Sequence, residues 1–291
     1  MDKNLIQRVG SGLIYGLLTF LCTTEYGAIL INKISPDLVK PHQLFYGLIT
    51  FFLVVGAYEG VRIMKFQGNL YQWLVLPLVA IVYYQLFTTR FFGFGFYFQF
   101  NLSEIFALLL ILIAIVTLFK FPQELYQDEG KLIFIVIYTV LPFGFALGLP
   151  KYFLNDNAFT WEVFLLFVLI WSSDSFAYFT GRMFGKHKMA PKISPKKTWE
   201  GFAGGVFFTL ILGYFIEQKF PDLRGNWIVV GLLVSIFAPL GDLVESQLKR
   251  TFGVKDSGNI IPGHGGVLDR LDSFIIAAPV VYLYFILENL F

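Results

Sequence analysis

Residues 246–272 gather cations, carboxylates and glycines into one short segment between two apolar runs. Its ionisable side chains are Lys249, Arg250, Lys255, Asp256, His264, Asp269, Arg270 and Asp272. Ionisable groups at a membrane boundary are costly unless they have a partner or a function. Cations suit phosphate, carboxylates suit a metal ion, and glycines allow close backbone approach. The segment therefore predicts an enzyme that acts on a phosphorylated substrate at a membrane surface.

Carboxylates flank this segment at helical spacing. Asp242, Glu245 and Lys249 follow one another at i, i+3 and i+7, and Asp269 and Asp272 at i and i+3. Each set would share one helical face, and a short loop joins the two helices, so we expect the carboxylates to converge. Oxygen ligands of this kind suit Mg²⁺ or Mn²⁺, with Asp242, Asp269 and Asp272 as the metal ligands. The alternative is that the aspartates pair with neighbouring lysines and arginines.

Four residues with three glycines, Gly263 to Gly266, lie between these carboxylates. Backbone N–H groups of such a run can approach an anion closely, although a plain tight turn would have the same composition. His264 would contact a phosphate or position a metal-bound water, or would make a structural hydrogen bond. Because no second histidine or cysteine stands at zinc-ligand spacing, the sequence predicts no zinc site.

A second basic segment occupies residues 181–201. It contains six cations, namely Arg182, Lys186, Lys188, Lys192, Lys196 and Lys197. With Ser194 and Thr198 among them, these cations could hold a phosphate by charge and by hydroxyl donation. The segment does not fit a Walker A loop, because no Ser or Thr follows Gly185-Lys186. Alternatively, the segment binds anionic headgroups and sets topology, and Thr198 simply caps the next helix.

Asp174 stands inside an apolar run, and Asp174, Tyr178 and Arg182 recur at i, i+4 and i+8 along one helical face. An aspartate inside a membrane span is a functional candidate, although it could instead be a neutral or arginine-paired packing residue. Glu59, in another apolar run, presents the same choice with less support.

The composition predicts the class of protein to which these candidate residues belong. The chain is 56% hydrophobic and only 14% charged, against about 25% charged residues in a soluble domain. Apolar runs of about 20 residues recur, each able to cross a bilayer. We predict an all-α polytopic integral membrane protein with a polar cytoplasm-facing cavity and about nine transmembrane helices. They are placed at 11–32, 44–63, 71–88, 104–120, 131–149, 161–181, 201–218, 227–247 and 273–290.

The two parts of this membrane unit differ in content. Residues 1–160 would hold N-terminal helices, and residues 161–291 would hold C-terminal helices that carry the motifs. The first run has no cleavage site and is read as a retained helix. The aromatic stretch 91–100 is typical of an interfacial belt, with a lipid-contacting gate as the alternative. The single cysteine, Cys22, excludes an internal disulfide and is read as a packing residue.

The basic residues are distributed unevenly about the predicted helices. The N-terminus and the segments after the second, fourth, sixth and eighth helices carry 16 of the 22 lysines and arginines. The positive-inside tendency places these segments, with both charged clusters, in the cytoplasm. The absence of a targeting peptide fits a bacterial inner membrane. Nothing in the composition suggests a nucleic-acid partner.

The charged segments resemble a known signature. The C-terminal segment resembles that of the CDP-diacylglycerol synthases, or phosphatidate cytidylyltransferases, in Ser246, Lys249, Arg250, Lys255, Asp256, His264, Gly265, Gly266, Asp269, Arg270 and Asp272. Residues 174–186 and 193–201 also resemble that family. The resemblance covers roughly residues 170–275, and the first 160 residues contribute nothing specific beyond Glu59.

The resemblance implies an activity in phospholipid biosynthesis. Phosphatidate and CTP would give CDP-diacylglycerol and pyrophosphate, with one or two Mg²⁺ ions, at a cytoplasm-facing site of a homodimer. Asp242 and Asp269 would hold metal, supported by Asp272 or Glu245. The catalytic set would be Asp242, Asp269, Lys249, Arg250, His264 and Arg270. Substrate binding would fall to Ser194, Lys196, Lys197, Thr198, Lys255, Asp256, Gly265, Gly266, Asp174 and Tyr178.

Other activities compete with this one. Membrane prenol kinases also use CTP, and CDP-archaeol synthases act on an ether-lipid phosphate. A secondary transporter would suit polytopic helices with an intramembrane aspartate. Transporters, however, tend to place charges near the midplane in repeated halves, whereas these charges cluster at one predicted face without a repeat. The complete 246–272 signature favours the cytidylyltransferase.

Overall fold

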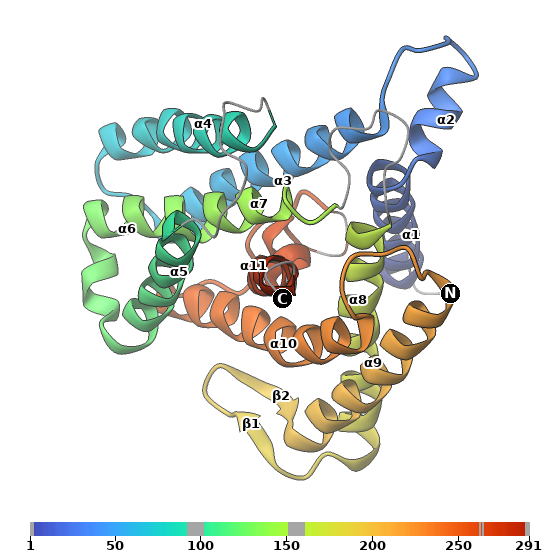
Figure 1. Ribbon diagram of the computed structural model, residues 1–291. Coiled ribbons are helices and arrows are strands. Elements are labelled where there is room, and N and C mark those ends of the chain that lie inside the picture. The colour runs from blue at the N-terminus through green and yellow to red at the C-terminus, as the bar shows by residue number, and fades with distance from the viewer. Residues whose placement is uncertain (1–2, 92–101, 151–160, 262, 264, 289–291) are drawn as a thin grey trace. The chain divides into compact units, whose positions relative to one another are not determined.

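The computed structural model describes residues 3–91, 102–150, 161–261, 263 and 265–288, and most of them are helical (Figure 1). The helices are α1 (Lys3–Thr23), α2 (Tyr26–Asn32), α3 (Pro41–Met64), α4 (Asn69–Phe91), α5 (Leu102–Lys120), η1 (Pro122–Tyr126), α6 (Asp128–Ile135), η2 (Val136–Val140), α7 (Leu141–Ala146), α8 (Glu162–Phe184), α9 (Trp199–Lys219), α10 (Trp227–Thr251) and α11 (Leu268–Glu288). A short antiparallel hairpin, β1 (Lys188–Ala190) and β2 (Ser194–Thr198), joins α8 to α9. The predicted all-α class is confirmed. The hairpin replaces a segment predicted as a loop.

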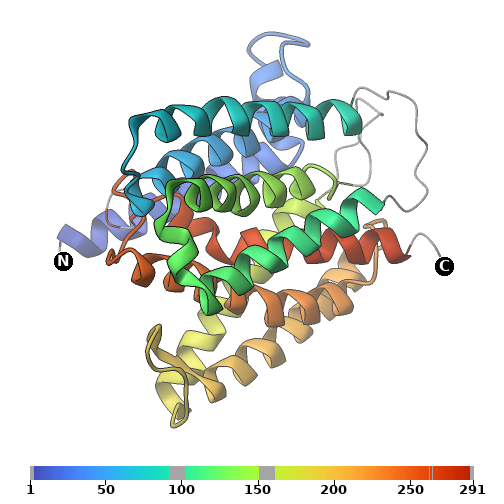
Figure 2. The ribbon, with the colours of Figure 1, turned by 90° about the vertical axis from the view of Figure 1, so that its left-hand side faces the viewer.

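Six helical stretches among the described residues are long and apolar enough to cross a membrane. They are Pro41–Met64, Asp128–Ala146, Glu162–Phe184, Trp199–Lys219, Trp227–Thr251 and Leu268–Glu288. The run from α6 through the π-helical turn η2 to α7 counts as one of them, and it continues in one direction in Figure 2. The chain is therefore an integral membrane protein. Helix occurs in all nine predicted ranges, but the count of nine spans stays a prediction.

The first predicted helix, 11–32, is not straight. It divides into α1 and α2, which meet at an angle of 83°. The hydroxyls of Thr23 and Thr24 donate to the carbonyls of Thr19 and Phe20, at 2.6 and 2.7 Å. Such bonds compete with the helical ladder and favour a bend. The sequence does not predict the bend, because the residues on both sides of it are mostly apolar.

The chain forms two compact units that alternate along the sequence. The first unit comprises Met1–Leu18, Tyr46–Gly148 and Gln247–Leu271, and the second comprises Thr19–Phe45, Leu149–Ser246 and Asp272–Phe291. Helices α10 and α11 contribute to both. Asp269 and Lys249 therefore belong to the first unit, and Asp242 and the hairpin belong to the second. The predicted partition at residue 160, and the predicted convergence of the two carboxylate groups, stay predictions.

In the first unit, one carboxylate fixes the turn between α3 and α4. Asp128, the first residue of α6, accepts the backbone N–H groups of Gln67 and Gly68 at 3.1 and 2.7 Å. The Lys131 ammonium lies 2.8 Å from the same carboxylate and 3.2 Å from the Lys65 carbonyl. The arrangement satisfies backbone donors that a tight turn would otherwise leave without partners.

In the second unit, α8 and α9 pack closely because glycines line their contact. A Cβ at Gly205 would come within 3.1 Å of the Ser173 carbonyl, and one at Gly201 within 2.6 Å of the Ala177 carbonyl. Figure 1 shows the two helices side by side with the hairpin at one end. Glu200 anchors the start of that hairpin by accepting the backbone N–H groups of Lys186 and His187 at 3.0 and 3.2 Å. The hairpin is thereby held beside α9.

Candidate functional site

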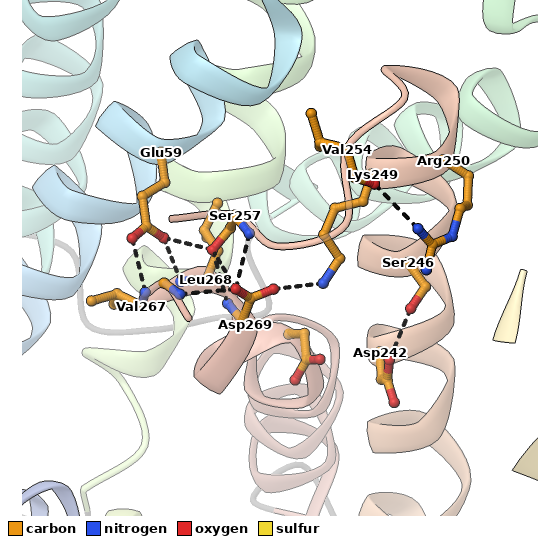
Figure 3. A network of polar contacts seen from close by, with 12 residues as sticks. Glu59, Asp242, Ser246, Lys249, Arg250, Val254, Ser257, Val267, Leu268 and Asp269 are labelled. Carbon is orange, nitrogen blue, oxygen red and sulfur yellow. Dashed lines mark hydrogen bonds and ion pairs between the residues drawn. The ribbon is translucent and has the colours of Figure 1, made fainter. Parts of the chain in front are cut away.

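Asp269 is the centre of the polar cluster in the first unit. It stands in the first turn of α11, and its carboxylate accepts from four donors (Figure 3). Oδ1 takes the Lys249 ammonium at 2.6 Å. Oδ2 takes the Ser257 and Gly266 backbone N–H groups, both at 2.9 Å, and the Ser257 hydroxyl at 3.0 Å. The signature segment thus folds around this carboxylate.

Glu59 supplies a second carboxylate to the same cluster. It projects from α3, is fully buried, and accepts the Ser257 hydroxyl at 2.9 Å. Its two oxygens also accept the backbone N–H groups of Val267 and Leu268, at 3.0 and 2.8 Å. These N–H groups open α11, where helices have donors without intrahelical partners and where negative charge is favourable. Glu59 therefore serves α11 as a cap supplied by another helix.

The glycines of the signature are fixed by this packing. Gly265 has φ +90°, and its backbone carbonyl accepts from Ile261 N at 2.9 Å, closing a tight turn. A Cβ at Gly265 would lie 2.6 Å from Asp269 Oδ2, and one at Gly266 would overlap the Ser257 hydroxyl and crowd both Glu59 oxygens. Both positions require glycine in the folded chain, as the tight-turn reading expects. Their predicted role in substrate binding stays a prediction.

The cations of the signature differ in exposure. The Lys249 side chain is 10% exposed and its partner Asp269 is 8% exposed. Arg250 is exposed and donates to the Val254 carbonyl at 3.2 Å, in a turn after α10. Lys255, Asp256 and Arg270 are exposed as well. Exposed cations of this kind are open to a phosphorylated ligand, whereas Lys249 is committed to the aspartate. His264 lies outside the described residues.

Asp242 is the centre of a polar cluster in the second unit. It projects from α10 and accepts the Ser246 hydroxyl at 3.1 Å (Figure 3). Its carboxylate also lies 2.7 Å from the Lys197 ammonium of β2. Lys197 also donates to the Pro239 carbonyl at 3.0 Å. Lys197 thus ties the hairpin to α10. The side chains of Lys197 and Asp242 are 22% and 32% exposed.

Three further carboxylates belong to this second cluster. Helices α10 and α11 approach so closely that a Cβ at Gly241 would overlap the Asp272 carbonyl. Asp242, Glu245 and Asp174 lie close enough to Asp272 to act on it electrostatically. Glu245 is buried, Asp272 is half-buried and Asp174 is exposed. Among the described residues, however, no three acidic, histidine or cysteine side chains are arranged to hold one metal ion together.

The remaining candidates lie on α8 and the hairpin. Thr198 is buried, and its hydroxyl accepts Gly201 N at 3.2 Å, so it caps α9 as one alternative foresaw. Ser194 begins β2 opposite Ala190, and Lys196 is exposed. Tyr178 is exposed with its hydroxyl 3.5 Å from the Arg182 guanidinium, which agrees with the predicted shared face.

The sequence predicts Asp242, Asp269 and Lys249 as site residues, but it does not predict all of their partners. The predicted alternative of ion pairing occurs for Asp269 with Lys249, whereas Asp242 pairs with Lys197 from the hairpin. One sequence feature could have identified Glu59: a glutamate inside an apolar run needs partners. No sequence feature identifies Ser257, because a serine beside a glycine is typical of any loop. Neither Glu59 nor Ser257 is among the site residues predicted from the sequence.

Comparison with known proteins bears on this site. The model of the cytidylyltransferase family matches residues 23–287. The phosphatidate cytidylyltransferase of Bacillus subtilis is 43% identical over 164 residues, which are 56% of this chain and 59% of that protein.

Two staphylococcal proteins are also similar. The phosphatidate cytidylyltransferase of Staphylococcus aureus (strain COL) is 52% identical over 123 residues, covering 41% of this chain and 47% of that protein. The phosphatidate cytidylyltransferase of Staphylococcus epidermidis (strain RP62A) is 48% identical over 127 residues, covering 43% and 48%. The alignments thus span about half the length of these curated relatives. Because the family model covers most of the sequence, the chain belongs to the cytidylyltransferase family.

Proposed function

We propose that this protein transfers a cytidylyl group from CTP to phosphatidate. A phosphate oxygen of phosphatidate attacks the α-phosphorus of CTP, a new P–O bond forms, and the bond from the α-phosphorus to the β-phosphate oxygen breaks. The products are CDP-diacylglycerol and pyrophosphate. A phosphate monoester already carries negative charge near neutral pH, so the attack requires no general base.

The observation that carries this proposal is the organisation of the signature around Asp269, within a chain of the cytidylyltransferase family. Both reactants are anions, so their repulsion must be reduced before they meet. The exposed cations Arg250, Lys255 and Arg270 are available to neutralise the triphosphate and the departing pyrophosphate. Lys249, paired with Asp269, would contribute its charge from a fixed position.

The carboxylates fit Mg²⁺ in chemical type. Asp242 presents hard oxygen ligands, is about one third exposed, and has Asp272 nearby in its own unit. Mg²⁺ commonly takes only one or two protein carboxylates and completes its shell with waters and substrate phosphates. We propose as its ligands the three carboxylates that the sequence predicts, Asp242, Asp269 and Asp272, of which Asp242 and Asp272 lie in the same unit. When bound, the ion would neutralise charge that develops on the CTP phosphates.

The hairpin is the proposed site for the phosphatidate headgroup. Lys196 is exposed at its surface, Ser194 begins β2, and Lys197 places a cation beside Asp242. Lysine and hydroxyl groups together provide the donors that a phosphate monoester accepts. Thr198 would support this site mainly by starting α9 at a fixed place. The acyl chains would remain in the bilayer.

Labelled CTP tests the reaction. Purified protein in detergent receives phosphatidate, Mg²⁺ and CTP labelled at either the α- or the γ-phosphate. We expect lipid-phase label only from α-labelled CTP. Lipid labelled from γ-labelled CTP in the presence of a prenol would instead identify a kinase. Activity confined to an ether-linked lipid phosphate would identify a CDP-archaeol synthase.

We further propose a cytoplasm-facing site in a homodimer. The charge asymmetry of the sequence supports the orientation, and the family resemblance supports the dimer. With Cys22 replaced by serine, a new cysteine at the exposed position 255 should react with impermeant maleimide only in inside-out vesicles. Native mass spectrometry should give twice the mass of one chain. Labelling in intact cells would show that position 255 faces the outside of the cell, and the mass of a single chain would exclude the dimer.

A further inference from the structure

Glu59 touches the part of the first unit that carries Asp269, although it lies about two hundred residues away in the sequence. It is fully buried and accepts three hydrogen bonds, from Ser257 and Val267 in the segment that joins α10 to α11 and from Leu268, the first residue of α11. A buried carboxylate is costly unless several donors satisfy it. The number and origin of these donors show that Glu59 is committed to this segment.

The Ser257 hydroxyl connects Glu59 to Asp269. Its oxygen lies 2.9 Å from Glu59 Oε2 and 3.0 Å from Asp269 Oδ2. A hydroxyl carries one hydrogen, so it can be donated fully to only one of the two carboxylates at a time. The position of this hydroxyl therefore depends on both carboxylates, and a displacement of Glu59 changes what Asp269 Oδ2 accepts. Figure 3 shows Ser257 between the carboxylates of Glu59 and Asp269.

Glu59 also determines where α11 begins. Val267 N and Leu268 N donate to its two oxygens, and Asp269 is the next residue. An isosteric amide at position 59 would turn an N–H₂ group toward one of these donors, which leaves the donor buried without an acceptor. The carboxylate, and not merely a side chain of that size, is required.

We propose that Glu59 is a positioning residue for cytidylyl transfer: it fixes the start of α11 and, through Ser257, the carboxylate of Asp269. This inference rests on the proposed function, because Asp269 is placed in the catalytic machinery there. It gives α3, in a part of the chain without a recognisable motif, a defined role in the reaction. Glu59 itself contacts no substrate in this account.

Four variants separate positioning from mere stability. Glu59→Gln removes the charge, and Ser257→Ala removes only the link between the carboxylates. Asp128→Asn is matched to the first, because Asp128 also accepts backbone N–H groups of a turn in the same unit. Thr139→Val is matched to the second, because Thr139 is buried and its hydroxyl donates to the Ile135 carbonyl.

Each purified variant is measured for melting temperature, for kcat and KM with both substrates, and for amide exchange in peptides covering residues 265–271. Residues that orient metal ligands typically change activity about 10- to 100-fold. We expect a kcat loss of that size for Glu59→Gln and about 10-fold for Ser257→Ala, with KM for phosphatidate within about 2-fold. Peptides 265–271 should exchange faster in Glu59→Gln. The two control variants should retain kcat, even where they melt earlier.

Two kinetic results would overturn the proposal. One is wild-type kcat in Glu59→Gln, and the other is a kcat loss that follows melting temperature equally in all four variants. If the wild-type protein makes no CDP-lipid, the proposed function is wrong. Amide exchange then still tests whether Glu59 anchors the start of α11. Unchanged exchange in Glu59→Gln would then overturn the positioning role, and faster exchange would preserve the anchoring of α11 by Glu59.

Discussion

Two lysine–aspartate pairs, one in each compact unit, have nearly the same length and different surroundings. Lys249 and Asp269 are 2.6 Å apart with side chains 10% and 8% exposed, and Lys197 and Asp242 are 2.7 Å apart with side chains 22% and 32% exposed. Asp269 also accepts three hydrogen bonds from Ser257 and Gly266, whereas Asp242 accepts one from Ser246. The first carboxylate is held in place, and the second can exchange its partner.

From this difference we expect distinct roles for Asp269 and Asp242, although the sequence predicts both of them as metal ligands. Removing one member of a buried, hydrogen-bonded pair is strongly destabilising, whereas a partly exposed pair contributes little. Asp242 can therefore exchange Lys197 for a metal ion at small cost, and Lys197 is then free to bind a phosphate. Asp269 would act from a fixed position that the fold provides. The following variants test this division, beginning with the largest expected effect.

Asp269→Asn should lose both activity and stability. The substitution removes the charge that pairs with Lys249, and such a loss costs about 3–5 kcal/mol of folding free energy. Turnover should fall about 100- to 1000-fold, because the metal ion that this carboxylate is proposed to hold would stabilise the transition state. Thermal unfolding in detergent and the labelled-CTP assay measure the two effects. Asp37→Asn, at an exposed position, is the control; wild-type melting of Asp269→Asn would contradict the fixed role.

Asp242→Asn should lose activity alone. Its pair with Lys197 is partly exposed, so the free energy of unfolding should change by no more than about 1 kcal/mol. Turnover should fall as far as in Asp269→Asn, because both carboxylates are proposed metal ligands. The same two assays apply. A destabilisation equal to that of Asp269→Asn would contradict the proposed difference between the two pairs. Retained turnover would show that Asp242 is not a metal ligand.

Lys197→Ala should change the Mg²⁺ requirement. A partly exposed pair contributes about 0.2–1 kcal/mol, so removing the lysine should lower the half-saturating Mg²⁺ concentration by up to about 5-fold. KM for phosphatidate should rise, because the headgroup loses a cation. Lys192→Ala, an exposed lysine on the same hairpin, should leave the Mg²⁺ requirement unchanged. An increased Mg²⁺ requirement in Lys197→Ala would show that Lys197 does not compete with the ion.

Thr198→Ala should have the smallest effect. The hydroxyl accepts Gly201 N and caps α9, and loss of such a cap costs about 1 kcal/mol. Thermal unfolding should register this loss while kcat falls only slightly, since Lys197 is displaced only a little. Thr198→Ser keeps the cap and should behave as wild type. A large kcat loss in Thr198→Ala without earlier melting would make Thr198 a substrate ligand and not a cap.

The sequence predicts local features well and distant partners poorly. Apolar runs of helical length placed α3, α8, α9, α10 and α11, because composition alone decides whether a helix can cross a membrane. Spacing placed Asp242 and Lys249 on one helix. The links Lys197–Asp242 and Glu59–Ser257 join residues 45 and 198 positions apart, and no local pattern encodes them. The bend after Thr23 and the hairpin depend on similar packing detail.

The central claim is that this protein makes CDP-diacylglycerol from CTP and phosphatidate with a divalent metal ion. Its most direct test follows labelled CDP-lipid and pyrophosphate together in purified wild-type protein, with Mg²⁺, with EDTA, and after Mg²⁺ is restored. The account predicts equal amounts of the two products, their loss in EDTA and their return with Mg²⁺. CDP-lipid formation that persists in EDTA would contradict the metal assignment, and the absence of CDP-lipid in Mg²⁺ would contradict the reaction itself.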